Sequence, residues 1–153
     1  MKLAIGCDDA ALELKEIIKD YLIKSRGIEF VDVGIYSLDE KDIYPNIAKK
    51  AANLIQDETS GIDFGILICG TGIGMAIAAN KFKGIRAAVC HDAFSTTRAK
   101  LSNNANVMTM GARVIGPEVA KLVTDIWLDN EYTEGRSVNN VNRIEEFEKE
   151  NLV

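Results

Sequence analysis

One segment near the middle of the chain reads Gly65-Ile66-Leu67-Ile68-Cys69-Gly70-Thr71-Gly72-Ile73-Gly74. Its apolar half is typical of a buried strand, and residues 75–80, which follow the glycines, are typical of the start of a helix. A glycine loop between a strand and a helix presents backbone N–H groups to an anion at the positive end of the helix dipole. The sequence therefore predicts an anion-binding loop with the Cys69 thiol at its edge.

Strand and helix signals alternate along the whole chain. The predicted strands are residues 2–6, 28–33, 64–68, 85–89 and 106–110, and the predicted helices are residues 12–24, 43–56, 75–80, 93–101 and 117–128. Parallel strands need right-handed helical crossovers. The pattern therefore predicts a three-layer, doubly wound, Rossmann-like α/β fold with a five-stranded parallel sheet, plus a polar C-terminal helix over residues 139–150.

Composition narrows the class of protein. A chain of 153 residues with 47% hydrophobic residues is expected to form a single domain over residues 1–153. The net charge of −5, without a basic cluster, argues against a nucleic-acid partner. The first apolar run is too short for a signal peptide and no run approaches a membrane span, so we expect a cytoplasmic protein. Three cysteines without a C-x-x-C spacing argue against disulfides and a zinc site, and we expect Cys7 and Cys90 to be structural.

Polar residues follow the predicted strands at the points where each strand ends. Because these ends share one edge of a parallel sheet, we expect them to gather around one site. The residues are Asp8 and Asp9 after the first strand, Cys69 and Thr71 after the third, His91 after the fourth, and Arg113 after the fifth.

Several of these residues have a structural alternative. Asp8 either caps the following helix or accepts hydrogen bonds from substrate hydroxyls. His91 is either exposed, cap-like or catalytic, and Arg113 binds either an anion or a surface carboxylate. Asp92 is predicted to be the N-cap of the next helix.

The chemistry that these residues suit is proton abstraction next to a carbonyl group. A thiol at a helix N-terminus can act as a base, because thiols there have a lowered pKa. The enediolate that results needs fixed donors, which a glycine loop supplies as backbone N–H groups. This chemistry requires no cofactor and no metal ion.

Further blocks accompany the glycine loop, and they are listed here in chain order: Ala4-Ile5-Gly6-x-Asp8, Leu14-Lys15, Val33-Gly34-x-Tyr36, Tyr44-Pro45, Ala78-Ala79-Asn80-Lys81, Gly84-Ile85-Arg86-Ala87-Ala88-x-Cys90-His91-Asp92, Asn103-x-Ala105-Asn106-Val107, Gly111-Ala112-Arg113-Val114-x-Gly116 and Gly135-Arg136. With these blocks the chain resembles the type B ribose-5-phosphate isomerases and the related galactose-6-phosphate isomerases along nearly its whole length. The glycine-loop block and the block ending in Asp92 are the most specific.

The resemblance implies metal-free aldose–ketose isomerisation of a sugar phosphate through a cis-enediol, of the ribose 5-phosphate/ribulose 5-phosphate type. It also implies a homodimer or a dimer of dimers with active sites at the subunit interface. It implies that Cys69 is the base and that Thr71 assists it. Asp8 would hold sugar hydroxyls, and the loop residues Gly70, Gly72, Ile73 and Gly74 would form the anion hole. The other expected substrate-binding residues are Asp9, His91, Asn103, Arg113 and Arg136. Asn103 and Arg113 are expected to come from a neighbouring subunit.

Three positions depart from the pattern of that family. Asp9 stands where the family usually has a phosphate-binding histidine, and Ser102 stands where it usually has a histidine credited with opening the furanose ring. Asn140 stands where a second arginine normally follows Arg136, although Arg143 lies one turn further on. A carboxylate beside a phosphate dianion repels it. We therefore expect ribose 5-phosphate to be a poor substrate.

Alternative functions need features that this sequence lacks or only partly has. Another phosphorylated or an unphosphorylated sugar is the main alternative substrate. A phosphoacceptor receiver domain also has an acidic pair after its first strand, but it needs an aspartate where this chain has Cys69. A non-catalytic nucleotide-binding module would use an acidic residue near Asp32 for a ribose, but the Gly-x-Gly-x-x-Gly spacing is missing after the first strand.

Overall fold

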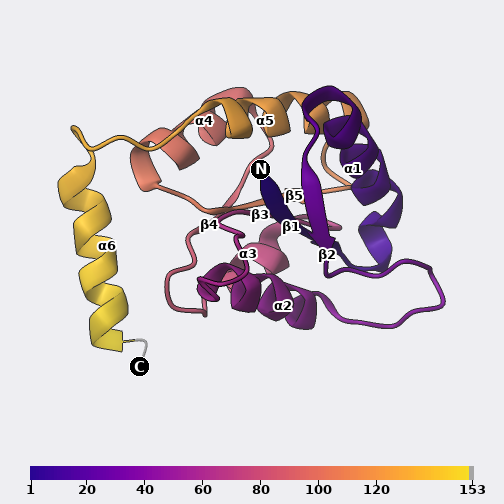
Figure 1. Ribbon diagram of the computed structural model, residues 1–153, viewed down its shortest axis with the longest axis horizontal. Coiled ribbons are helices and arrows are strands. Elements are labelled where there is room, and N and C mark those ends of the chain that lie inside the picture. Colours follow the sequence, from indigo (N-terminus) through magenta and orange to yellow (C-terminus); the bar gives the residue numbers. More distant parts are fainter. Residues whose placement is uncertain (152–153) are drawn as a thin grey trace.

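The centre of the molecule is a parallel sheet with the strand order β2-β1-β3-β5-β4 (Figure 1). In this computed structural model, which describes residues 1–151, the strands are β1 (Lys2–Cys7), β2 (Glu29–Asp32), β3 (Gly65–Cys69), β4 (Ala87–Val89) and β5 (Val107–Gly111). The chain continues to one side of β1 to make β2 and then crosses to the other side to make β3. The switch in direction lies between β1 and β3, and ligands bind at such a point beyond the carboxyl ends of the strands.

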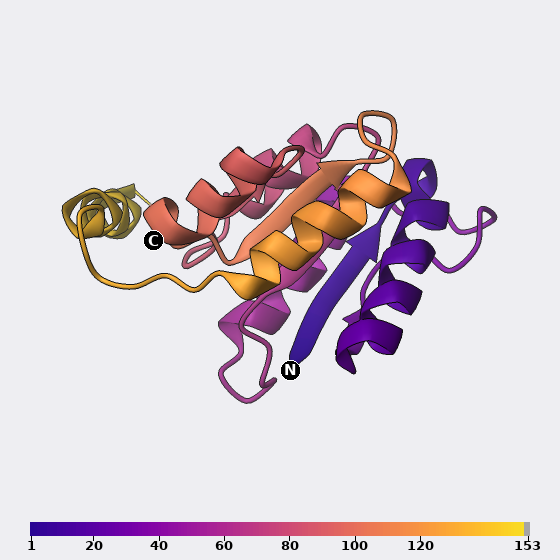
Figure 2. The same cartoon turned by 90° about the horizontal axis from the view of Figure 1, so that it is seen from above.

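Helices cover both faces of the sheet (Figures 1 and 2). One face carries α1 (Leu12–Arg26), α4 (Ala93–Asn103) and α5 (Pro117–Asp129), and the other carries α2 (Tyr44–Gln56) and α3 (Ile73–Ala79). Successive strand residues point to opposite faces, so Ile66 and Ile68 pack with the first group while Leu67 and Cys69 pack with the second. Within residues 1–151, no helix is long and apolar enough to cross a membrane.

The predicted fold class is confirmed, and most element boundaries differ from the prediction by one or two residues. β4 begins at Ala87 rather than at residue 85, because the Arg86 N–H donates to Asn106 Oδ1 at 2.8 Å. Asn106 Nδ2 also donates to Gly84 O at 2.7 Å, so one side chain satisfies the backbone where strand pairing was expected. α4 continues to Asn103 and ends because Asn104 is left-handed, with φ 48°.

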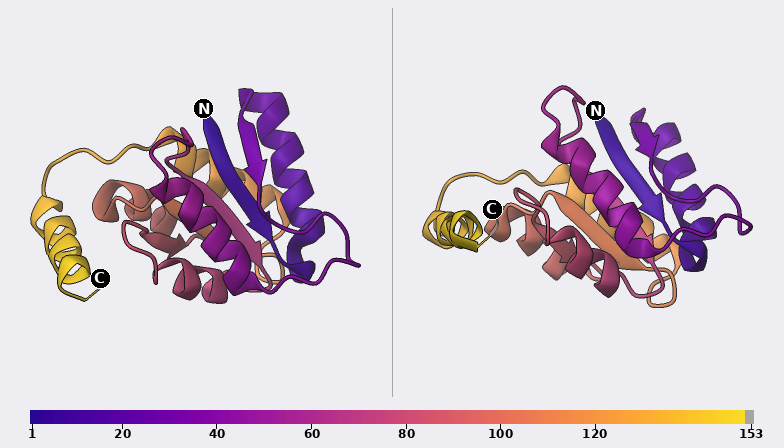
Figure 3. Two further views of the ribbon diagram at one scale, coloured as in Figure 1. Left: turned by 60° about the horizontal axis from the view of Figure 1, so that its bottom comes forward. Right: turned by 90° about the horizontal axis from the view of Figure 1, so that it is seen from below.

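The last helix, α6 (Val138–Asn151), stands apart from the sheet at the end of a long connection (Figure 3). A polar C-terminal helix was predicted for this part of the chain. Only Val141 is buried in it, while Ile144 and Phe147 remain 44% and 48% exposed. Glu148 joins α6 to the rest of the molecule by accepting a 2.7 Å hydrogen bond from the Gly84 N–H. Part of the apolar face of α6 is therefore uncovered in the single chain.

Candidate functional site

The strand register aligns three of the expected residues at the carboxyl edge of the sheet. Cys69 pairs with Gly111 across β3 and β5, and Cys7 pairs with Ile68, so Asp8 follows β1 at the level of Cys69. Val89 pairs with Thr109, which brings His91 to the level of Gly111. Neighbouring strands lie about 4.8 Å apart. Asp8, Cys69 and His91 therefore share one edge, as the sequence predicted.

Cys69 is 5% exposed and its thiol lies on the face covered by α2 and α3. Its Sγ accepts a hydrogen bond from the Gly72 N–H at 3.1 Å, which fixes the thiol against the glycine loop. The exposed Thr71 accepts from the Ile73 N–H through Oγ1 at 3.3 Å. Two amides of the expected anion hole are thus used inside the loop.

The next two amides remain as donors. Ala76 N–H is the first in α3 to bond back within the helix, to Gly72 O at 3.1 Å. The N–H groups of Gly74 and Met75 come earlier in the first turn and have no acceptor within the helix. They are the donors that the loop offers to an anion beside Cys69.

The glycines of this loop allow a close backbone approach. Gly72 is left-handed, with φ 77°, and a Cβ there would lie 2.8 Å from the backbone carbon of Met110. A Cβ on Gly111 would lie 2.6 Å from the backbone of Thr71. Gly74 packs against the ring of Tyr44, which a Cβ would approach to 2.7 Å. A larger side chain at any of these positions would force the loop away from β5 or from α2.

Arg113 lies in the site of its own chain. Its N–H donates to Gly70 O at 3.0 Å, and its side chain lies over Gly70, where an added Cβ would be 3.6 Å from Arg113 Cδ. This placement differs from the expectation that Arg113 serves the site of a neighbouring subunit. The guanidinium also faces Asp8. Burial raises the pKa of the Asp8 carboxyl, while the Ala10 N–H, which donates to Asp8 Oδ1 at 3.2 Å, and the charge of Arg113 oppose that rise.

Asp8 and Asp92 both act as caps. Asp8 caps the short 3₁₀ turn Asp9–Ala11 that precedes α1, which leaves its second carboxylate oxygen for a substrate hydroxyl. Asp92 accepts from the Ser95 N–H at 2.7 Å and is the N-cap of α4, as predicted.

His91 is partly buried and holds the end of β5. Its Nε2 accepts a hydrogen bond from the Gly111 N–H at 2.9 Å, so the ring is neutral and carries its proton on Nδ1. Burial lowers the pKa of His91 below its ordinary value of 6.5, although the charge of Asp92 acts in the opposite direction. The position of Gly111, and with it the contact to Thr71, depends on this bond.

The other two cysteines are buried on the opposite face of the sheet from Cys69, in the core that α1, α4 and α5 cover. Burial raises the pKa of Cys7 to about 12 and that of Cys90 to about 11. Thiols with so high a pKa stay protonated at neutral pH and are therefore poor bases.

A cavity of about 510 Å³ opens beside this edge. It is lined by Asp8, Asp9, Leu38, Glu40, Lys41, Asp42, Ile43, Tyr44 and Pro45. Four carboxylates and one ammonium group make its wall acidic, which favours hydrogen bonds from sugar hydroxyls and disfavours a phosphate dianion. Asp9 therefore lines an acidic cavity rather than an anion pocket.

Two expected residues lie at the opposite edge of the sheet. Asn103 ends α4 close to the start of β5, and Nδ2 of Asn103 donates to Arg98 O. Arg136 is exposed in the connection between α5 and α6, which leaves the same edge (Figure 2). Ser102 also lies at the end of α4 and accepts a hydrogen bond from Arg98. None of these three comes near Cys69 of the same chain.

Sequence reasoning missed the role of the segment 33–43 and of Tyr44. The pair Tyr44-Pro45 was visible in the sequence as a block but carried no predicted function. Asp32, the residue that a nucleotide-binding module would use for a ribose, is instead paired with Lys15 and Lys19 at 2.8 and 2.7 Å. Among the residues that the structure describes, no group of three or more His, Cys, Asp or Glu side chains is arranged to hold a metal ion.

Comparisons with known proteins identify a family that matches nearly the whole chain. A model of the Ribose/Galactose Isomerase family matches residues 3–144. The chain is 50% identical over 151 residues to ribose-5-P isomerase B of Listeria innocua, covering 99% of each chain. It is 48% identical over 148 residues to D-erythrulose-4-phosphate isomerase of Pectobacterium atrosepticum, covering 97% of this chain and 95% of that one. The solved structure of ribose-5-phosphate isomerase B of Clostridium thermocellum matches with a TM-score of 0.90 and 41% identity, covering 98% and 99% of the two chains.

The bond between His91 and Gly111 predicts a pH dependence of stability. Because the folded chain depresses the pKa of His91, the unfolded chain takes up a proton near pH 6.5 that the folded chain does not. The free energy of unfolding of the wild type should therefore fall relative to that of His91→Gln as the pH is lowered from 7.5 to 5. The glutamine oxygen can accept the same bond but does not titrate, and His91 is the only histidine. Urea unfolding at each pH measures the difference, and a constant difference would contradict this account.

Proposed function

This chain belongs to the Ribose/Galactose Isomerase family and is a sugar-phosphate aldose–ketose isomerase, and we propose that Cys69 moves the proton between the two sugar carbons. The observation that supports this role is the position of its thiol. Sγ lies at the end of β3, accepts the Gly72 N–H, and is next in register to Asp8 at the acidic cavity. It is the one thiol among the three that lies on the face of the sheet covered by α2 and α3.

The proposed reaction is balanced without any other reagent. The Cys69 thiolate takes the proton from C2 of the open-chain aldose, and the C–H electron pair forms the C1–C2 double bond of an enediolate as the C1 carbonyl oxygen gains charge. The amides of Gly74 and Met75 stabilise that charge. The O2 proton then moves to O1, and the thiol returns its proton to C1, which gives the ketose. Thr71, the exposed hydroxyl on the same loop, assists the transfer between the two oxygens.

In this proposal, negatively charged and positively charged side chains bind different parts of the substrate. The carboxylates of Asp8 and Asp9 accept hydrogen bonds from the sugar hydroxyls, and the guanidinium of Arg113 attracts the phosphate. His91 supports the site through Gly111.

We also propose a homodimer in which Arg136 and Asn103 of one chain complete the site of the other. Asn103 lies at the edge opposite to Cys69, and Arg136 lies in the connection from α5 to α6, so in this proposal both serve the site of a second copy. Large apolar side chains also surround the site and are exposed, with Ile73 at 54%, Phe94 at 75% and Val114 at 54%. A second copy that covered them would remove this apolar surface from water. The three free cysteines fit a cytoplasmic enzyme.

For the substrate, we propose a four-carbon sugar phosphate of the erythrulose 4-phosphate type. Ribose 5-phosphate closes a furanose ring through its C4 hydroxyl, and the ring must open before C2 can lose a proton. A tetrose whose O4 carries the phosphate has no hydroxyl that can close such a ring. Ser102, at the position of the expected ring-opening histidine, cannot act as an acid near neutral pH. The similarity to the Pectobacterium atrosepticum enzyme supports the same choice.

The role of Cys69 is tested by Cys69→Ala, which should lower kcat by about two to four orders of magnitude, as loss of a general base usually does. Cys90→Ala is the matched control, because that thiol is buried behind β4 and should leave turnover nearly unchanged. Circular dichroism and urea unfolding verify that both variants fold. A Cys69→Ala variant with ordinary turnover would remove Cys69 from the mechanism.

The shared site is tested by mixing two inactive variants, Cys69→Ala and Arg136→Ala. Random assembly gives half mixed dimers, and each mixed dimer has one site with both residues intact, so activity should recover to about a quarter of the wild type. Light scattering should report a dimer or a larger assembly. A stable, active monomer, or a mixture with no recovery, would show that Arg136 does not complete a neighbouring site.

The substrate choice is tested with erythrulose 4-phosphate and ribose 5-phosphate side by side. We expect kcat/KM to be at least about tenfold higher for the four-carbon substrate, and the value for ribose 5-phosphate to lie below about 10⁴ M⁻¹s⁻¹. Combining Asp9→His, Ser102→His and Asn140→Arg should raise activity on ribose 5-phosphate alone. Equal efficiency on both substrates, with no gain in the variant, would contradict the proposal.

A further inference from the structure

The segment 33–43 joins β2 to α2 without a helix or strand of its own, and it forms one wall of the cavity beside Asp8. Leu38, Glu40, Lys41, Asp42 and Ile43 of this segment line the cavity. Most of the segment is exposed, so its shape depends on the few contacts that hold its first residues.

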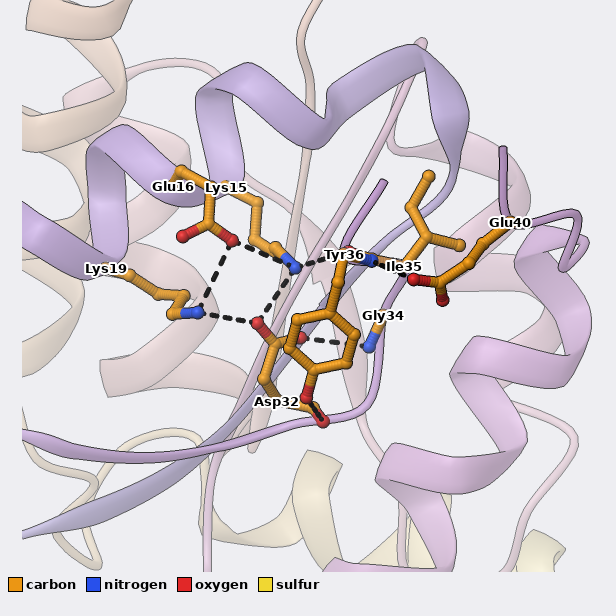
Figure 4. Close-up of polar contacts among 8 residues, drawn as sticks. All are labelled: Lys15, Glu16, Lys19, Asp32, Gly34, Ile35, Tyr36 and Glu40. Atoms are coloured by element: carbon orange, nitrogen blue, oxygen red, sulfur yellow. Dashed lines mark hydrogen bonds and ion pairs between the residues drawn. The ribbon is translucent and has the colours of Figure 1, made fainter. Parts of the chain in front are cut away.

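Two hydrogen bonds fix the backbone of Ile35, one through its N–H group and one through its carbonyl oxygen. The Ile35 N–H donates to Cys7 O at 3.2 Å, directly before Asp8. The Ile35 carbonyl accepts a 2.6 Å hydrogen bond from Lys15 Nζ (Figure 4). A Cβ on Gly34 would lie 2.4 Å from Cys7 N, so this part of the segment is pressed against the end of β1.

Lys15 is the centre of this arrangement. Its side chain is fully buried, and its Nζ lies 2.8 Å from Asp32 Oδ2, 3.1 Å from Glu16 Oε1 and 4.9 Å from the centre of the Tyr36 ring. Burial lowers the pKa of Lys15, but the bonds to Asp32 and Glu16 outweigh it and leave the pKa above 10.5. The ammonium group therefore stays charged and keeps its acceptors at all physiological pH values.

The same contacts continue to the cavity wall. The Tyr36 O–H donates to Asp32 O at 2.9 Å, and the Tyr36 N–H donates to Glu40 Oε1 at 3.2 Å (Figure 4). Glu40 is itself a lining residue of the cavity. A continuous path of contacts therefore runs from the buried ammonium group to the surface that faces the substrate.

We propose that Lys15 is a positioning residue for the substrate pocket, which fixes the segment 33–43 against β1 so that its wall is preformed opposite Asp8. This inference rests on the proposed function. A preformed wall lowers the cost of ordering the segment when the sugar binds, so Lys15 acts on substrate affinity more than on the chemical step.

Lys19 supplies a matched control, because it shares Asp32 with Lys15 but makes no hydrogen bond to the segment. Lys19 Nζ lies 2.7 Å from Asp32 Oδ2 and is partly exposed. When Lys15 is replaced by methionine, Asp32 keeps Lys19 and also accepts from the Gly34 N–H at 3.0 Å. The fold therefore retains a paired carboxylate, while Ile35 O loses its only side-chain donor.

The experiment compares Lys15→Met with Lys19→Met on erythrulose 4-phosphate and ribose 5-phosphate, using whichever the wild type converts. We expect Lys15→Met to raise KM at least about fivefold with kcat within about threefold, and Lys19→Met to change both less than about twofold. Backbone hydrogen exchange of residues 34–43 should rise in Lys15→Met and not in Lys19→Met. Tyr36→Leu, which removes the outer part of the same path, should change KM in the same direction if Lys15→Met does not fold.

The inference would be overturned if Lys15→Met left both KM and the hydrogen exchange of residues 34–43 unchanged. It would also be overturned if the two lysine variants had equal effects, because the effect would then come from the charge on Asp32. A general loss of stability would instead change exchange across the whole sheet. If the wild type converts no sugar phosphate, the proposed function fails, and an unchanged exchange of residues 34–43 in Lys15→Met would separately refute the anchoring by Lys15.

Discussion

The site depends on one close contact between two backbone segments, the glycine loop after β3 and the turn after β5. Ala112 N–H and Arg113 N–H donate to the carbonyls of Cys69 and Gly70 at 2.9 and 3.0 Å. Gly72 and Gly111 leave no space for a Cβ at this contact. Because backbone groups rather than flexible side chains make the contact, the thiol, the loop amides and the guanidinium are held at fixed separations. Such preorganisation is what stabilisation of an enediolate requires.

Charge divides the surroundings of this contact into two regions. The cavity between β1 and α2 is acidic, with Asp8, Asp9, Glu40 and Asp42, while Arg113 lies over the glycine loop. A substrate with hydroxyls at one end and a phosphate at the other has a single favourable orientation in such a field.

Most of the fold was predictable because each element carries its own signal. Apolar runs marked the buried strands, and Asp92 marked the start of α4 by a local hydrogen bond to Ser95. The prediction was less accurate where a distant side chain replaced backbone pairing, as Asn106 does at the start of β4. The burial of Lys15 likewise has no local signal, since a charged residue on an amphipathic helix is normally exposed, and the acceptors Asp32 and Ile35 O make its burial stable.

The sequence by itself determined the class of fold and the set of polar residues at the strand ends, because these follow from local periodicity and from the rule that parallel strands end at one edge. Only the tertiary structure decided the strand order, in which β5 lies between β3 and β4 and brings Gly111 and Arg113 beside Cys69. It also decided that Arg113 lies in its own chain's site while Asn103 and Arg136 lie at the far edge. The reason is physical: strand pairing and the path of a long connection are set by contacts between residues far apart in the chain, which no local pattern records.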